Sequence, residues 1–176
     1  MPGSSWFQPG LALNIFVSLF LIVIIPLLLG ELVSIPPGPA AGLIVATLII
    51  EYSAPVAGLA AGLPPVYTGV AVIFVASGVI FLQYSVFDAM YNRSEKVRGF
   101  LESIRQKYGG SERVKRYRVL ALAPAILTVG FYISPAISWL FGWDRKISFL
   151  VMMSVYSLAT AGVLIAGLGI IRWVFG

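Results

Sequence analysis

Two glutamates, Glu31 and Glu51, stand within long apolar stretches and are the side chains best placed to do chemistry. A carboxylate inside a membrane is costly, so it faces the protein interior or water and is held by a partner or a proton. Twenty residues separate the two, and a hairpin between them would create a carboxylate pair suited to proton coupling. We therefore expect Glu31 and Glu51 to bind a coupling ion or a substrate, Glu31 above all.

Glu31 precedes a run in which three of four positions are proline, Pro36-Pro37-Gly38-Pro39. Such a run bars a regular helix, and irregular backbone at membrane depth survives only when it is buried in protein or lines a wet cavity. One interpretation is a broken helix whose ends hold an ion or a substrate, with Ser34, Pro36 and Gly38 in the site. The alternative is an ordinary surface loop after a first span.

A second interrupted segment runs from Pro124 to Pro135 and adds Thr128, Gly130 and Tyr132 to the candidate site. Paired breaks in two halves of a chain favour an inverted-repeat transporter. Because Pro135 removes the backbone bond to residue 131, we expect Thr128, Tyr132 and Ser134 to face the protein interior and to satisfy the freed groups. The alternative is a helix that a proline merely kinks.

The elements that must position these residues follow from hydropathy. The chain is 59% hydrophobic and only 11% charged, whereas soluble domains are about 25% charged. At about 20 apolar residues for each crossing, residues 1–176 form a single all-α integral membrane domain. It has four to five transmembrane segments, of which two are Pro/Gly-broken or re-entrant, and an inverted repeat is one interpretation. Clean spans are predicted at 11–30, 66–87 and 147–171, and interrupted ones at 31–65 and 119–143.

Residues 88–118 hold nine of the twelve basic residues and separate a first half, 11–87, from a second half, 119–176. Basic loops stay on the cytoplasmic side of a membrane, so this connector is predicted to be cytoplasmic in a multi-pass protein of the cell membrane. The turn Asp144 to Lys146 is then expected outside and Arg172 inside. The N-terminus is outside if 31–65 crosses once, and inside if that region dips in and returns.

The basic connector is also predicted to contain an amphipathic helix over 94–108, because apolar residues recur there on one helical face. Such a helix suits the surface of an anionic inner leaflet. Nucleic acid is not expected as a partner, since the nearest polyanion is the membrane itself. The residues expected to contact anionic lipid are Lys96, Arg98, Arg105, Lys107, Lys115 and Arg116.

The absence of Cys and His from the sequence excludes thiol nucleophiles, haem ligation by His and the usual His-containing metal sites. Membrane hydrolases and transferases show clusters of polar residues, and no such cluster lies inside a predicted span. We therefore expect no enzyme activity, no catalytic residue, no metal and no cofactor.

Order and spacing of several motifs resemble the small multidrug export proteins of archaea and bacteria, which are distantly related to the DedA (VTT-domain) membrane proteins. The resemblance covers most of the chain and implies proton-coupled transport, and movement of lipids or lipid carriers between leaflets. The chain departs from the family where Val33 replaces an Arg and where a Pro-x-Pro-Gly-Thr-Gly-like run is reduced. The matching residues are Glu31-Leu32 with Pro36, Gly62-Leu63-Pro64-Pro65, and Pro124, Thr128, Gly130 and Tyr132.

Two functions fit these patterns. The first is a small transporter or lipid-handling protein with paired broken helices, which is coupled to protons and works alone or as a homodimer. The second is a scaffold or accessory subunit that is stable only with the other subunits of a larger membrane complex. Purification of the chain alone with a polar cavity would favour the first function.

Overall fold

The computed structural model of the chain describes residues 10–108 and 122–175, and the described part contains helices and no strand. Five helical stretches are long and apolar enough to cross a membrane. The all-α membrane fold is thereby confirmed. The elements are α1 (Leu11–Leu19), a π-helical turn (Phe20–Ile24), α2 (Ile25–Leu32), α3 (Pro37–Ile50), a 3-10 turn (Glu51–Ser53), α4 (Ala54–Ala60), α5 (Pro65–Arg93), α6 (Glu95–Tyr108), α8 (Leu122–Leu140) and α9 (Arg145–Phe175).

The first span runs unbroken through α1 and α2, from Leu11 to Leu32. Its π-helical turn lies where Pro26 offers no N–H to the preceding turn, so the wider turn accommodates the missing bond. The carbonyl of Pro26 accepts a hydrogen bond from the Tyr67 hydroxyl at 3.1 Å. This bond ties the first span to the start of α5.

A tight corner joins α2 to α3. Ser34 has a positive φ of 59°, and its N–H donates to the Glu31 carbonyl at 3.0 Å while the Ile35 N–H donates to the Gly30 carbonyl at 2.8 Å. This is the Schellman pattern that ends helices. Pro37 then begins α3, where a missing N–H costs nothing. The interpretation of the proline run as a break within the membrane is therefore wrong, because these prolines begin a helix at a corner.

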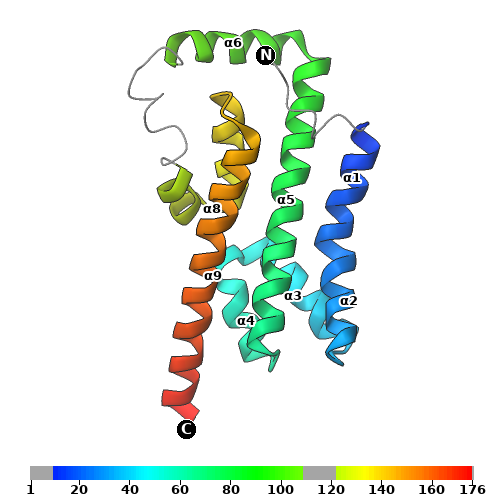
Figure 1. The fold of residues 1–176 in the computed structure, drawn as a ribbon, viewed down its shortest axis with the longest axis vertical. Helices are drawn as coiled ribbons and strands as arrows, with labels where there is room; N and C mark the ends of the chain where they lie inside the picture. The colour runs from blue at the N-terminus through cyan, green and yellow to red at the C-terminus, as the bar shows by residue number, and fades with distance from the viewer. Residues whose placement is uncertain (1–9, 109–121, 176) are drawn as a thin grey trace.

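Helices α3 and α4 fold back on each other as a re-entrant hairpin. A Cβ on Gly58 would lie 3.0 Å from Leu43 Cδ1, although 15 residues of straight helix would separate the two positions by about 22 Å. Both ends of the hairpin lie at the same end of the molecule. The start of α3 and the start of α5 meet beside the end of α2, because a Cβ on Gly30 would touch both Ala40 and Tyr67. Its tip is Glu51, which has a φ of 42°. In Figure 1 this hairpin fills the half of the bundle farther from α6.

Helix α8 is a second hairpin that enters from the opposite end. Gly130, with φ 74° and ψ −173°, breaks it into residues 122–129 and 131–140. Both halves lie in the half of the bundle nearer to α6 (Figure 1). The second half returns to that end, where the Trp139 indole donates to Asp88 Oδ1 at 3.1 Å. The two re-entrant segments therefore enter from opposite ends, as two interrupted halves of a repeat require.

Residues 37–93 and residues 122–175 share one order of elements, with a spacing of 80 residues between equivalent positions. Each half consists of a hairpin, a Schellman corner and one long helix, α5 or α9, and Figure 1 shows these two helices running in opposite directions. At the first corner the Gly62 and Leu63 N–H groups donate to the carbonyls of residues 59 and 58. At the second corner the Gly142 and Trp143 N–H groups donate in the same pattern to the carbonyls of residues 139 and 138. These matched corners agree with the interpretation as an inverted repeat.

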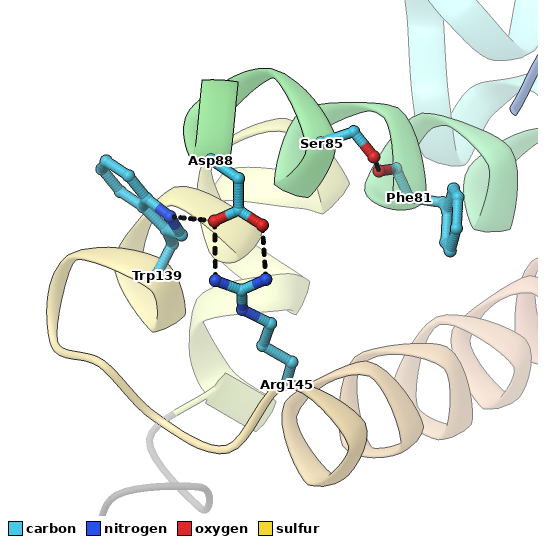
Figure 2. A network of polar contacts seen from close by, with 5 residues as sticks. All are labelled: Phe81, Ser85, Asp88, Trp139 and Arg145. Atoms are coloured by element: carbon cyan, nitrogen blue, oxygen red, sulfur yellow. Dashed lines mark hydrogen bonds and ion pairs between the residues drawn. The ribbon is translucent and has the colours of Figure 1, made fainter. Parts of the chain in front are cut away.

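The second corner lies at the α6 end of the molecule, where Arg145 forms a two-pronged ion pair with Asp88 near the end of α5 (Figure 2). The expectation that the Asp144 to Lys146 turn lies opposite the basic connector is wrong, because α8 returns to its own side. The expectation that Arg172 shares the connector's side is wrong too, since α9 ends at the far end. The first span begins at the α6 end, in agreement with a region 31–65 that dips in and returns.

Helix α6 confirms the predicted amphipathic helix to within one residue, and α5 extends past the predicted limit of 87 to Arg93. Ser94 caps α6, since its hydroxyl accepts the Val97 N–H at 3.4 Å. In Figure 1, α6 lies crosswise to α5 and passes over the ends of α8 and α9. Leu101 of α6 is buried, whereas Phe100, which belongs to the apolar face predicted for this helix, is 63% exposed.

The hairpin geometry predicts the result of cysteine labelling in this Cys-free chain. Cysteine at Ser103 and at Lys146 should react from one side of the membrane, and cysteine at Gly38 from the other, because α8 returns to the side that it entered. Labelling with a membrane-impermeant maleimide before and after permeabilisation measures this. Reaction of residues 103 and 146 from opposite sides would show that α8 crosses the membrane.

The Asp88 and Arg145 ion pair should couple the two halves measurably but modestly. Its side chains are 26% and 29% exposed, so we expect a coupling of about 1 kcal/mol between Asp88→Asn and Arg145→Gln in a double-mutant cycle. The measurement is the free energy of unfolding in detergent micelles. Asp88→Asn with Lys96→Gln is the control pair and should be additive; a coupling near zero for both pairs would contradict the prediction.

Candidate functional site

The tips of the two hairpins meet in the middle of the bundle, and Glu51 occupies the contact. A Cβ on Gly130 would lie 1.8 Å from Glu51 Oε2, so the carboxylate rests directly on the glycine backbone. The carboxylate also accepts a hydrogen bond from the Phe131 N–H. Gly130 serves two needs here, because it tolerates a φ of 74° and it leaves space for the carboxylate.

This contact places a carboxylate at the start of a helix. Phe131 is the first residue of the half-helix 131–140, and N–H groups at a helix start lack acceptors within their own helix. They carry the positive end of the helix dipole, which favours an anion. Glu51 therefore caps the half-helix of the opposite repeat. Within the described residues, the other charged side chains belong to positions near the ends of the long helices or to α6.

Two tyrosines bind the hairpins to each other reciprocally. The Tyr52 hydroxyl, on the first tip, donates to the Ile126 carbonyl of the second hairpin. The Tyr132 hydroxyl, on the second tip, donates to the Leu48 carbonyl of the first. Each tip thus satisfies a backbone carbonyl close to the break in the other hairpin, as irregular backbone at membrane depth requires.

The carbonyls freed around Gly130 also find partners. Ser134 Oγ donates to the Gly130 carbonyl at 2.8 Å, and Gln83 Nε2 of α5 donates to the Phe131 carbonyl at 3.4 Å. The latter carbonyl is the one that Pro135 leaves without an intrahelical donor. The expectation that a hydroxyl serves the carbonyl of residue 131 is therefore wrong, because its donor is the Gln83 amide and the Ser134 hydroxyl bonds the Gly130 carbonyl.

An aromatic cluster from α9 supports the junction. The ring of Tyr156 lies 5.1 Å from that of Tyr52 and 5.3 Å from that of Phe131, between centroids. Tyr156 is fully buried, and its hydroxyl lies beside that of Thr160, also buried. Neither hydroxyl has a hydrogen bond of good geometry among the described residues, nor does Gln83 Oε1. Polar groups with spare bonding capacity therefore surround the junction.

The junction brings together three predicted site residues, Glu51, Gly130 and Tyr132, and excludes most of the others. Glu31 is exposed at the end of α2, and the 14 residues of α3, about 21 Å of helix, lie between it and the tip. Ser34, Pro36 and Gly38 belong to the same corner as Glu31. A carboxylate pair of Glu31 and Glu51 does not form.

Thr128 does not face the interior as expected. It is exposed and its hydroxyl donates to the Pro124 carbonyl of its own helix at 2.8 Å. Ser134 is fully buried, as expected, and Tyr132 is 37% exposed with its hydroxyl turned into the junction.

Sequence reasoning missed the roles of Tyr52, Gln83 and Tyr156. The signal that could have found Tyr52 is a repeated pattern, since Tyr52 and Pro55 recur as Tyr132 and Pro135 at the 80-residue spacing. No comparable pattern marks Gln83 or Tyr156, because these residues come from the long helices and meet the tips only in space.

The predicted lipid-contact residues lie partly within the described chain. Lys96 and Arg98 are exposed on α6, and the Arg98 guanidinium stacks over the Tyr91 ring at 5.4 Å. Arg105 and Lys107 belong to α6, but their side chains lie outside the described residues, as do Lys115 and Arg116 entirely.

Comparison of the chain with family models, curated proteins and solved structures finds no match in any of the three. The resemblance to small multidrug export proteins therefore stays a prediction from the motifs.

Gly130→Ala should destabilise the protein by about 4 kcal/mol, of which about 2 come from a backbone of φ 74° and ψ −173°, which is essentially restricted to glycine, and about 2 from overlap with Glu51. Gly62→Ala is the control for a positive φ without overlap, because Gly62 has a φ of 78° and no atom within 4 Å of an added Cβ. It should cost about 1 kcal/mol. Unfolding in detergent micelles measures both, and equal losses would show that the tips do not touch as described.

A second measurement tests the cause of the loss. Glu51→Ala should cost less stability in the Gly130→Ala background than in the parent, because it removes the overlapping carboxylate. Additive costs would contradict a direct contact between the two positions.

Proposed function

We propose that this chain is a small membrane transporter or lipid-handling protein in which a proton on Glu51 controls the contact between the two hairpin tips. The observation that carries the proposal is the Glu51 carboxylate seated on Gly130 and the Phe131 N–H, where the tips of two inverted hairpins meet. Inverted repeats with broken helices hold substrates and coupling ions at such mid-membrane contacts. The resemblance to small multidrug export proteins agrees with this assignment.

The coupling follows from what the carboxylate does at the helix start. As an anion, Glu51 accepts the Phe131 N–H and balances the helix dipole, which favours closed tips. A proton removes that charge and weakens the hydrogen bond from the Phe131 N–H, so the protonation state of Glu51 changes how firmly the tips are held together. By linkage, the position of the tips changes the affinity of Glu51 for a proton to the same degree.

The surroundings of the junction favour an amphiphilic substrate that enters from the side. Glu51 is half-buried and Tyr132 is 37% exposed, so the junction is reachable between the hairpins and the membrane. The apolar side chains around the tips are well exposed, notably Ile49 at 73%, Leu127 at 53% and Ile133 at 51%. Such a surface suits a molecule with an apolar body and a polar or charged group.

Transport in reconstituted vesicles tests the proposal with two probes, a fluorescent phosphatidylglycerol and the lipophilic cation ethidium. Wild-type protein should move at least one of them, at a rate that depends on the pH gradient. Glu51→Gln keeps the shape of the side chain and removes its charge, so the pH dependence should disappear. Glu31→Gln is the matched control and should behave as wild type, because Glu31 lies at an exposed corner.

Two results would contradict the proposal. A Glu51→Gln protein that keeps its pH dependence would remove Glu51 from the coupling step. A wild-type protein that moves neither probe, and that is stable only with other membrane subunits, would favour the scaffold function instead.

A further inference from the structure

A groove of about 430 Å³ lies near the α6 end of the molecule, well away from the hairpin tips. Its lining comes from the start of α1, the end of α5 and the start of α6. Figure 1 shows α1 and α5 side by side and α6 following the end of α5. Its volume falls within the roughly 300–1,000 Å³ of small-ligand sites. The lining residues are Leu11, Ile15, Val86, Ala89, Met90, Arg93, Ser94 and Val97.

The groove has an apolar floor and a cationic mouth. Val86 and Met90 follow one face of α5, opposite Leu11 and Ile15 of α1, whereas Arg93 lies at the end of α5 and is exposed. Val86 and Arg93 are seven positions apart, so about 10 Å of helix separates the apolar floor from the cation at the mouth. A ligand that fits must carry an apolar chain at one end and a negative charge at the other.

A second feature at the mouth also selects an anion. Helix α6 is 14 residues long and starts at Glu95, directly after Arg93 and Ser94. Its N-terminal end carries the positive part of its dipole. Glu95 is the acidic residue of the same turn, and it is exposed.

We propose that the groove binds one anionic phospholipid, with a single acyl chain between α1 and α5 and the phosphate on Arg93 at the start of α6. The orientation matches the membrane, because the mouth lies at the level of α6 and the apolar floor extends toward the bilayer core. The site is separate from the hairpin tips, so it holds a bound lipid and takes no part in the proposed proton step. It fixes the corner at which α1, α5 and α6 meet.

Native mass spectrometry of the full chain, purified in detergent and titrated with phosphatidylglycerol or phosphatidylcholine, tests the site. One phosphatidylglycerol should be retained in preference to phosphatidylcholine. Arg93→Gln should weaken phosphatidylglycerol binding about fivefold, as expected for loss of one Arg at a membrane surface. Lys96→Gln is the matched control, since it removes a cation three residues away that does not line the groove, and it should have a smaller effect.

A second variant tests the apolar part of the groove. Ala89→Phe should fill it and reduce retention of both lipids, while Ile165→Phe, at a 72% exposed position of α9, should change neither. Equal effects of Arg93→Gln and Lys96→Gln would overturn the proposal in favour of general attraction to a basic surface. Equal retention of the two lipids, or retention that Ala89→Phe leaves unchanged, would overturn it as well.

Discussion

Every backbone polar group at membrane depth must find its partner inside the protein, and this constraint governs the centre of the molecule. Two helices are broken there, at Glu51 and at Gly130, and each break frees N–H or carbonyl groups that lipid cannot serve. The partners come from the other repeat or from the long helices, as the bonds of Tyr52, Tyr132 and Gln83 show. Neither break is therefore self-sufficient, and the two repeats depend on each other for a satisfied backbone.

The proposed function requires the hairpin tips to separate, and this dependence sets the cost of that separation, because the bonds between the tips must then be replaced. The long helices α5 and α9 are each continuous, whereas the hairpins touch each other through a few polar contacts and one carboxylate. In the proposed function, a change of charge at Glu51 acts on the contact between the two hairpins and needs no rearrangement within either hairpin. The ion pair of Asp88 and Arg145 lies at the α6 end, away from that contact, and holds α5 to the second corner.

Hydropathy predicted the helical membrane fold, the long helices and α6, because these depend on length and amphipathic period alone. Hydropathy left open whether an interrupted region crosses the membrane or turns back, since a mostly apolar segment of 24 residues from Pro37 to Ala60 suits either course. The proline run drew attention to Glu31 because a proline-rich segment occurs both where a helix begins and where a helix breaks. Its composition does not distinguish the two. The real break at Glu51 carries no glycine, so its positive φ left no mark in the sequence. The repeat was marked, by Tyr52 with Pro55, Tyr132 with Pro135, and Gly62 with Gly142.

The reciprocal tyrosine bonds also set an order of events during synthesis. Tyr52 and its acceptor Ile126 are 74 residues apart in the chain, which corresponds to roughly 4–15 s of translation. For that interval the first hairpin has been made while the residues that complete its tip do not yet exist. The nascent first half must therefore be sheltered by the insertion machinery, or wait at the membrane surface, until the second half arrives.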